Sequence, residues 1–364
     1  MAEMNVLSVT SDFPILCVEP IHHGKVRTMY SLSLEESRKL AEKNGFAIHP
    51  DTQLAVMVIS DRISAFECHW VAEGEMAGVP GKGAALNSIA AHWFGRFVEA
   101  GLGSHHIVDI PHPLVWIVQK ARPIMVEAIA RQYITGSMWR AYNKGQRTFG
   151  GQTLSDSYAK NQKLNELLLT PSTKGVVTGI PGVPEEDDTP ITREQVREHW
   201  KSFAFEDLSH VDTVEQMLQQ GFQLISNSLD NVGQIFVDTK FEFGYVTTPD
   251  GSNSIVYMDE VGTPDSSRMW DKSAYEQGEI VDYCKESFRQ FLLSTLDNDI
   301  LTTGSRLQER KSMAAAYRVP LAEMMDVSAR YQFIAEQITG KPLPQVERPY
   351  EAISDALASY GLLR

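Results

Sequence analysis

Two adjacent acids and an arginine lie in a short stretch that begins with an apolar run. Residues 256–270 read VYMDEVGTPDSSRMW and carry Asp259, Glu260, two serines and Arg268. Carboxylates of this kind hold Mg²⁺, which prefers a few carboxylates together with phosphate oxygens and water. A guanidinium binds phosphate or carboxylate through parallel hydrogen bonds. The stretch is therefore a candidate site for a magnesium–nucleotide ligand.

The strand before this stretch supplies another acid. Residues 234–247 read QIFVDTKFEFGYVT, and side chains alternate between two faces. One face holds Asp238, Lys240 and Glu242, and the other holds Ile235, Val237, Thr239, Phe241 and Phe243. Asp250-Gly251 is a strong signal for a two-residue hairpin turn, which places Glu242 opposite Asp259. Facing like charges destabilise a hairpin unless something neutralises them, so this register predicts a magnesium site. The alternative is a longer loop, a shifted register and a solvated polar face.

Basic residues recur at flexible turns elsewhere in the chain. The stretch HHGKVRTMY places Lys25 and Arg27 on one face of an extended segment beside Gly24. The stretch PGKGAAL leads Lys82 into a helix start, where free backbone N–H groups favour anions. An edge strand with solvated cations and an ordinary helix entry are the respective alternatives.

Two further stretches combine cations with hydroxyl groups. ARQYITGSMWR brings Arg131, Ser137 and Arg140 around Gly136, and TPSTKG adds Lys174. Arginine beside hydroxyls at a turn suits bidentate recognition of phosphate or carboxylate. A capped helix and an ordinary turn are the alternatives.

Composition limits the class of protein. The 364 residues carry a net charge of −14, which argues against generic nucleic-acid binding, and 43% are hydrophobic, as in soluble globular proteins. Apolar runs are too short to cross a membrane. Residues 1–14 show no secretory signal. Three widely spaced cysteines favour a reducing compartment, so we expect a cytoplasmic protein.

The elements that must position these residues are predicted from periodicity and turn signals. LAVMVISDRIS and LVWIVQKA predict buried strands, and residues 86–98 between them have the spacing of an amphipathic helix closed by Gly101. Residues 170–191 are rich in proline and glycine and predict a long functional loop. Further predictions are extended chain at 124–134, a helix from its cap Ser137 to Lys144, helices at 192–203 (with a Thr192–Gln195 capping box) and 209–228, a hairpin at 233–261, and helices near 273–297, 320–338 and 348–362. The order of elements predicts an α+β fold.

Seven of these stretches together resemble the phosphoribosylaminoimidazole-succinocarboxamide synthase (SAICAR synthetase) family. They read GKVRTMY, SDRISAFE, PGKGAALNSIAAHWF, VEAIARQYITGSMWRAY, TPSTKG, DTKFEFGYV and DEVGTPDSSRMW, in family order over residues 24–270. The resemblance implies two domains: an N-terminal antiparallel sheet domain similar to a kinase small lobe, and a larger α+β domain with a helical C-terminus. We expect an ATP-binding domain at 1–122, a substrate and magnesium domain at 123–295, and a helical extension at 296–364 packed on the second domain.

The resemblance implies an ATP-dependent ligase of purine biosynthesis. It joins L-aspartate to carboxyaminoimidazole ribonucleotide and gives SAICAR, ADP and phosphate, after phosphorylation of the imidazole carboxylate. ATP and Mg²⁺ are the implied cofactors, and the partners are these small molecules; the sequence leaves a homo-oligomer open. The matching motifs imply the roles of single residues. ATP binding is expected of Gly24, Lys25, Arg27, Lys240 and Glu242, and Mg²⁺ is expected to be held by Glu242 and Asp259. The residues expected to be catalytic are Lys25, Lys240, Glu242 and Asp259, and those expected to bind substrate are Arg131, Ser137, Arg268, Asp61, Ser64, Lys82 and Lys174.

Two other functions are compatible with the same motifs. A kinase-like phosphotransferase would stop after phosphorylation, and an inactive nucleotide-binding regulator would keep only the fold. Lys25, Glu242, Asp259 and Arg268 are all retained, which argues against an inactive protein.

The chain departs from the family pattern at three places. Glu67 ends SDRISAFE where the family usually has Asp, so its carboxylate reaches one methylene further. Asp187-Asp188 stands where the family has His-Asp, and Gly262 replaces the Leu that usually follows DEV. Neither the aspartate site nor the role of residues 296–364 follows from the sequence.

Overall fold

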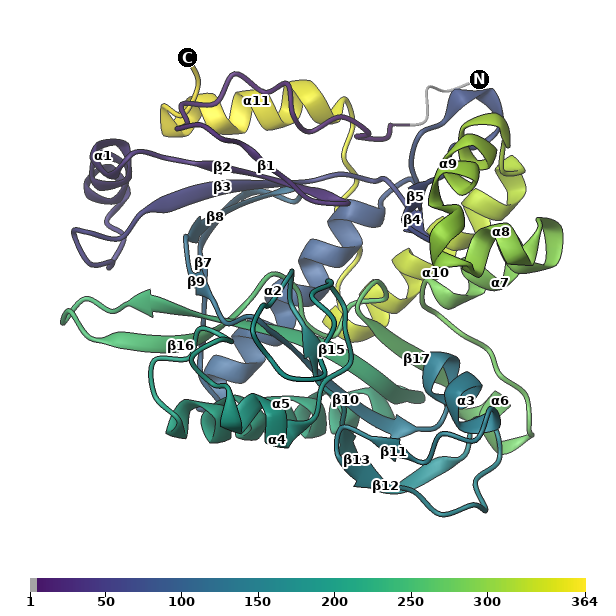
Figure 1. Cartoon of the computed structure of the whole chain (residues 1–364). Coiled ribbons are helices and arrows are strands. Elements are labelled where there is room, and N and C mark those ends of the chain that lie inside the picture. The colour runs from purple at the N-terminus through teal and green to yellow at the C-terminus, as the bar shows by residue number, and fades with distance from the viewer. Residues whose placement is uncertain (1–4) are drawn as a thin grey trace.

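The first sheet is antiparallel and has the strand order β1, β2, β3, β8, β7 (Figure 1). The computed structural model describes residues 5–364. The strands are β1 (His22–His23), β2 (Arg27–Ser31), β3 (Leu54–Ile59), β8 (Val115–Gln119) and β7 (Ile107–His112). The two apolar runs form β3 and β8, which pair with each other and are buried along nearly their whole length, so the predicted buried strands are confirmed.

Helix α2 (Lys82–Glu99) lies between the first sheet and the second (Figure 1). Its buried face carries Ala85, Ile89, Trp93 and Phe97 among others, because these positions recur at helical spacing. The helix confirms the one predicted at 86–98 and begins one turn earlier. It ends at Glu99 with Ala100 as its C-cap, and Gly101, whose φ of 67° suits glycine, follows the cap. Helix α1 (Leu34–Asn44), capped by Ser33, was not predicted.

The second sheet has the strand order β13, β10, β15, β16, β6. These strands are β13 (Lys163–Leu169), β10 (Val126–Tyr133), β15 (Gln234–Thr247), β16 (Asn253–Met258) and β6 (Ser104–His105); β14 (Ser172–Thr173) pairs with β10, and β9 (Arg122–Pro123) and β17 (Ser267–Asp271) pair with β15. Helix α5 (Ser209–Asp230) packs on β10 and β15. Two small hairpins complete the strands: β4 (Ser64–Ala65) with β5 (Cys68–His69), and β11 (Thr148–Phe149) with β12 (Gln152–Thr153).

The hairpin of β15 and β16 corrects the predicted register by one residue. Glu242 pairs with Met258 instead of Asp259. The connection is a five-residue loop, 248–252, in which the Asp250 carboxylate accepts a hydrogen bond from the Ser252 amide at 3.1 Å. The Asp-Gly pair therefore lies inside a longer turn, the alternative left open by the sequence.

A second correction concerns the faces of β15. The pairing with β17 shifts between Phe236 and Asp238, which marks a β-bulge. Ile235 and Val237 consequently pack with Trp270, whereas Phe241 and Phe243 belong to the main core. The prediction that these four residues share one face is wrong.

Two predicted helices differ in their ends. Helix α4 (Arg193–Glu198) has the predicted Thr192–Gln195 capping box but stops before 203. Helix α3 (Gly136–Asn143) has Thr135 at its N-cap position, so Ser137 is an exposed first-turn residue and not the cap.

The C-terminal region is helical, as predicted, but is interrupted and placed differently. Its helices are α6 (Lys272–Glu276), α7 (Glu286–Thr295), α8 (Asn298–Thr302), α9 (Leu307–Ala316), α10 (Leu321–Thr339) and α11 (Pro349–Tyr360). The helix expected over 273–297 is broken between α6 and α7, where Gly278 has a φ of 84°. Helix α10 packs on α2, and α11 lies beside β7 of the first sheet (Figure 1). The expectation that this whole segment packs on residues 123–295 is wrong.

No helix within residues 5–364 is long and apolar enough to span a membrane.

Candidate functional site

Glu242 is a buried acid on β15 that two lysines contact. Lys174, in the loop after β14, forms an ion pair with one of its carboxylate oxygens, and Lys240 Nζ lies 3.5 Å from the other. Lys240 also pairs with the buried Glu127 of β10, which the Ser172 hydroxyl binds at 2.9 Å. The structure thus brings together three residues that the sequence selected, and it adds Glu127, which the sequence reasoning missed.

The protonation behaviour of this group follows from burial and neighbouring charge. Burial lowers the pKa of Lys240, but the carboxylates of Glu242, Glu127 and Asp259 outweigh burial and hold that pKa above its ordinary value. Burial raises the pKa of Glu127 to about 7, and the nearby carboxyl group of Asp188 adds to the rise against the opposing charge of Lys240. Lys240 therefore stays charged at neutral pH, whereas the carboxyl group of Glu127 titrates near neutral pH.

Arg27 on β2 connects the first sheet to the acids of the second. Its guanidinium is buried and binds the Asp259 carboxylate at 3.2 Å and the Glu260 carboxylate at 3.1 Å. It also lies 5.7 Å from the centre of the Trp116 ring, within the range of a cation–π contact. Asp259 has a φ of 57°, a left-handed conformation that is uncommon outside glycine and must be held by its surroundings. Arg27 supplies one such contact.

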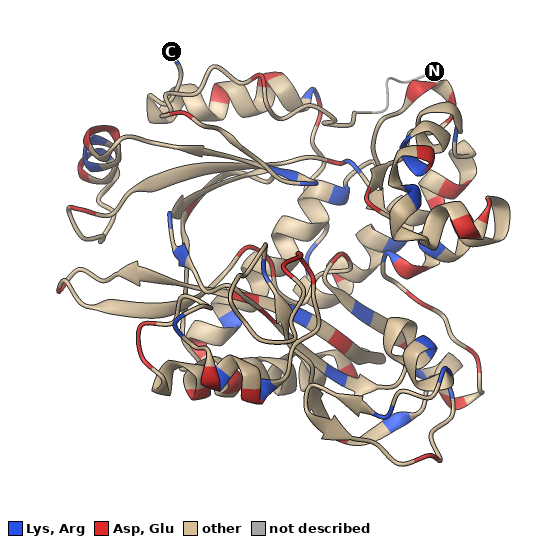
Figure 2. Ribbon diagram, viewed as in Figure 1, with Lys and Arg blue, Asp and Glu red and all other residues tan. Residues whose placement is uncertain are grey.

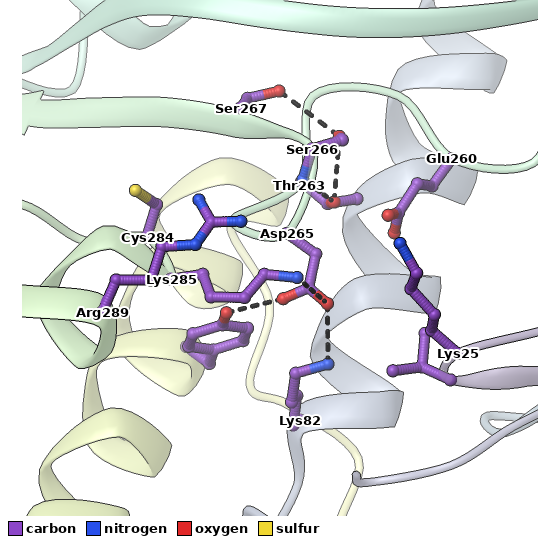
Figure 3. A network of polar contacts seen from close by, with 12 residues as sticks. Lys25, Lys82, Glu260, Thr263, Asp265, Ser266, Ser267, Cys284, Lys285 and Arg289 are labelled. Carbon is purple, nitrogen blue, oxygen red and sulfur yellow. Dashed lines mark hydrogen bonds and ion pairs between the residues drawn. The ribbon is translucent and has the colours of Figure 1, made fainter. Parts of the chain in front are cut away.

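Lys25 lies two residues before Arg27 and is exposed. Its ammonium group points toward Glu260 (Figure 3). Its backbone carbonyl lies 2.6 Å from His69 Nε2, so the β4–β5 hairpin contacts this segment. An exposed lysine above paired acids is free to take a phosphate.

Asp238 lies on the same face of β15 as Glu242, and its carboxylate binds two arginines that were predicted to bind substrate. Its Oδ2 atom accepts a hydrogen bond from Arg131 Nη1 at 2.9 Å and another from Arg268 Nη1. Arg131 Nε also donates to the Thr170 hydroxyl at 2.9 Å. Gly136 packs against Arg268: its φ is 56°, and an added Cβ atom would clash with the guanidinium group of that arginine. Asp238 was recognised on this face in the sequence but not as a site residue; its position two residues before Lys240 was the available signal.

The loop before β17 is anchored from below by a buried cluster (Figure 3). Asp265 accepts hydrogen bonds from Lys82 Nζ at 2.9 Å and from the Tyr331 hydroxyl at 2.6 Å, and Lys285 Nζ lies 3.1 Å away. Lys285 and Lys82 overcome the effect of burial and hold the pKa of Asp265 well below its ordinary value. Lys82 was expected to bind substrate, and the structure buries it completely as the partner of Asp265.

The remaining predicted substrate residues are spread around this centre. Asp61 is buried and accepts hydrogen bonds from the Leu7 and Gly83 amides, both at 2.8 Å, and burial raises its pKa to about 6. These bonds tie the N-terminal segment to the start of α2. Ser64 is buried in β4, and Ser137 is exposed at the start of α3.

Each departure from the family pattern has a local partner. Glu67 forms an ion pair with Arg310 of α9 at 3.0 Å. Asp187 accepts hydrogen bonds from the amides of Gly175 and Asp188, which closes the loop that carries Lys174. Gly262 has a φ of 61°, and an added Cβ atom would lie 2.7 Å from the Trp93 ring, so the tryptophan excludes a leucine there.

The site is therefore a row of anchored cations in an acidic protein. Lys and Arg lie close to Asp and Glu on several strands of the second sheet (Figure 2). Ion pairs in a partly buried site hold cations in fixed directions, which suits recognition of phosphate and carboxylate groups.

Comparisons with known proteins identify the family of this chain. The family model described as SAICAR synthetase matches residues 20–300. The phosphoribosylaminoimidazole-succinocarboxamide synthase of Shewanella baltica is 55% identical over 346 residues, which cover 95% of this chain and 94% of the relative. A solved SAICAR synthase of Saccharomyces cerevisiae, complexed with SAICAR, superimposes with a TM-score of 0.65 at 23% identity and covers 93% of this chain and 99% of its own. A SAICAR synthetase solved in complex with ADP gives a TM-score of 0.55 at 19% identity, covering 90% of this chain and 100% of its own.

Proposed function

The chain belongs to the SAICAR synthetase family, and from that premise we propose how its site performs the ligation of L-aspartate. The acceptor is carboxyaminoimidazole ribonucleotide, and the reaction consumes ATP and releases ADP and phosphate. The SAICAR and ADP named for two structural neighbours support this choice of ligands.

The order of charges along one face of β15 carries the proposal. Asp238, Lys240 and Glu242 follow at alternate positions, and the first and last Cα atoms are about 14 Å apart, since a strand rises about 3.4 Å per residue. Asp238 holds two arginines at one end, and Glu242 holds Lys174 at the other. An anionic ribonucleotide and the phosphates of ATP therefore have neighbouring cationic subsites with Lys240 between them.

The chemistry consists of two displacements. An oxygen of the imidazole carboxylate bonds to the γ-phosphorus of ATP, and the bond from that phosphorus to the bridging oxygen breaks, which releases ADP. The amine of aspartate then attacks the acyl carbon, the bond from carbon to the phosphate oxygen breaks, and the nitrogen loses a proton as the amide forms. Such phosphoryl transfer needs positioning and charge neutralisation more than covalent help.

The lysines and arginines take separate parts in this scheme. Lys240, whose pKa is raised, stays protonated and neutralises charge on the transferring phosphoryl group. Lys25, with Gly24 beside it, contacts the ATP phosphates from the exposed edge of the site. Lys174 approaches the same phosphates from the loop after β14. Arg27 already holds Asp259 and Glu260, so its main part is to fix these acids.

The arginines on Asp238 are assigned to the ribonucleotide. Arg131 and Arg268 both donate to one carboxylate oxygen of Asp238. This shared contact fixes the orientation of both guanidinium groups and therefore of their other nitrogens. Their fork of donors suits the phosphate and the carboxylate of this substrate. Ser137 lies in the first turn of α3, directly after the Gly136 that packs on Arg268, and is assigned to the same ligand.

Mg²⁺ fits the carboxylates of Glu242 and Asp259 when phosphate oxygens accompany them. Both carboxylates raise the pKa of Lys174 and of Lys240, so both acids lie around the same ammonium groups. Within residues 5–364, no three acidic, histidine or cysteine side chains are arranged to hold a metal. Two carboxylates with phosphate oxygens and water are the usual shell of this ion. When bound, it would neutralise charge on the phosphates.

The three cysteines, Cys17, Cys68 and Cys284, are free thiols. Free thiols fit a reducing compartment, and we place the reaction in the cytoplasm.

Substrate omission tests the proposed reaction. ADP formation by the purified protein is measured with ATP and Mg²⁺, with the ribonucleotide and aspartate supplied together and each omitted in turn. We expect turnover only with both. Turnover that ignores aspartate would instead favour a phosphotransferase, and turnover that ignores both would contradict the ligase.

A further inference from the structure

Arg310 of α9 is a buried arginine that lies beyond the part of the chain matched by the family model, residues 20–300. Its Nε atom donates to the Ile300 carbonyl at 3.0 Å, and Nη2 donates to the Thr303 carbonyl at 2.8 Å. Its Nη1 atom donates to the Phe66 carbonyl at 3.3 Å and to the Glu67 carboxylate at 3.0 Å. One side chain thus joins the C-terminal segment to the turn of the β4–β5 hairpin.

The turn that Arg310 contacts is strained. Phe66 and Glu67 join β4 to β5 and have φ angles of 53° and 61°. Two left-handed residues in a row form the tight turn that hairpins favour, but glycine, asparagine or aspartate usually occupies it. A phenylalanine and a glutamate there persist only if surrounding contacts fix the turn. Arg310 provides two of those contacts, one to each residue.

The opposite side of the hairpin reaches the candidate site. His69 of β5 contacts the Lys25 carbonyl at 2.6 Å, and β4 carries Ser64. The chain after the hairpin is held by the same C-terminal segment: the Glu73 amide donates to the Val319 carbonyl at 2.9 Å, and the Ser328 hydroxyl donates to the Pro80 carbonyl at 2.6 Å. A continuous set of contacts therefore runs from α9 and α10 to the backbone of Lys25.

We propose that residues 301–339 are a positioning element for the phosphate-contacting segment around Lys25, and that Arg310 is its central residue, acting through the β4–β5 hairpin. The extra methylene of Glu67, relative to the aspartate usual in the family, carries its carboxylate to this arginine. The assignment of Lys25 to ATP phosphates rests on the proposed function, whereas the clamp on the hairpin rests on contacts alone.

Hydrogen–deuterium exchange tests the clamp without reference to activity. Arg310→Met keeps the length of the side chain and removes its donors. Hydrogen bonds from a charged donor stabilise the closed hairpin. Their loss in Arg310→Met should therefore make the amides of residues 63–70 exchange about tenfold faster or more. Arg318→Met is the matched control, because Arg318 makes a two-point ion pair with Glu75 on the exposed surface of the same region. Exchange at 63–70 that stays at the wild-type rate in Arg310→Met, or that rises equally in the control, would overturn the proposal.

Steady-state kinetics test the positioning role. We expect Arg310→Met to raise the KM for ATP about tenfold while kcat changes by less than about threefold, since Lys25 is displaced but the reacting groups remain. A fall in kcat at constant KM would mean that the arginine serves stability alone. If Arg310→Met yields no folded protein, Glu67→Ala, at an exposed carboxylate, must still speed exchange at 63–70, and unchanged exchange contradicts the clamp. A wild-type protein without ligase activity would refute the proposed function and leave the exchange test intact.

Discussion

Glu242 and Asp238 lie on one face of β15, and each carboxylate holds two cations in place. Removing the charge of such an acid changes the direction of its partners as well as the charge of the site. The residues named from the sequence are therefore only part of the site, because Asp238 and Glu127 set the geometry of three of them.

Glu242→Gln keeps the size of the side chain and removes its charge. We expect turnover to fall about 100-fold or more, because phosphoryl transfer depends on fixed charges around the phosphate. Activity is measured as ADP formation over a range of Mg²⁺ concentrations, with circular dichroism as the check on folding. Wild-type turnover in a folded Glu242→Gln protein would refute both the metal and the catalytic assignment.

Arg268→Ala separates the two subsites along β15. The variant leaves the buried Asp238 carboxylate with only one arginine, and we expect the KM for the ribonucleotide to rise about tenfold or more. The KM for ATP is measured in the same preparation and should change little. A rise confined to ATP would place this arginine in the other subsite.

Glu127 predicts a pH-dependent contribution to stability. Its folded pKa of about 7 lies above the ordinary glutamate value, so the folded state holds this proton more tightly than the unfolded chain. Stability from this group is fully present below about pH 4.3 and is lost as pH rises through about 7. We expect the free energy of unfolding of the wild type, relative to Glu127→Gln, to fall by about 1 kcal/mol or more between pH 5 and pH 7.5. Urea unfolding measures this difference, and a difference independent of pH would contradict the raised pKa.

At the scale of elements, local signals predicted most pieces and tertiary contacts decided how they meet. The runs of β3 and β8, the amphipathic period of α2 and the Thr192–Gln195 capping box depend on neighbouring residues, so the sequence revealed them. The register of β15 and β16 depends on how the loop closes on the Asp250 side chain. The alternation of polar and apolar residues along the strands does not predict that closure. The burial of Lys82 likewise depends on Asp265, which is distant in sequence.

The cluster around Asp265 should be the most sensitive anchor between elements. Asp265→Asn leaves Lys82 and Lys285 buried without a full negative charge, and breaking such a buried pair costs about 3–5 kcal/mol. Asp230→Asn, which breaks an exposed pair with Lys272, should leave the stability nearly unchanged, because solvent screens this pair. Thermal unfolding compares the two variants, and equal losses would mean that the buried cluster is no special anchor.

At the scale of the whole molecule, the site exists only because distant segments converge. Lys25 and Arg27 come from the first sheet, Lys174 and Glu242 from the second, and Asp265 is held by α2 and α10. The sequence predicted which residues belong together through the order of seven family stretches. It did not predict that C-terminal helices pack on α2 and the first sheet, because amphipathic helices show a buried face without showing its partner.

The fate of the carboxylate oxygen of the ribonucleotide is the decisive test of the proposed phosphorylation of that carboxylate. The ribonucleotide is prepared with ¹⁸O at both oxygens of its imidazole carboxylate and turned over with unlabelled ATP and aspartate, and the released phosphate is analysed by mass spectrometry. If the carboxylate is phosphorylated and then displaced by the amine, each phosphate carries one ¹⁸O atom from the substrate. Unlabelled phosphate, with SAICAR formed at the same rate, would contradict an acyl phosphate and the charge arrangement assigned to stabilise its formation.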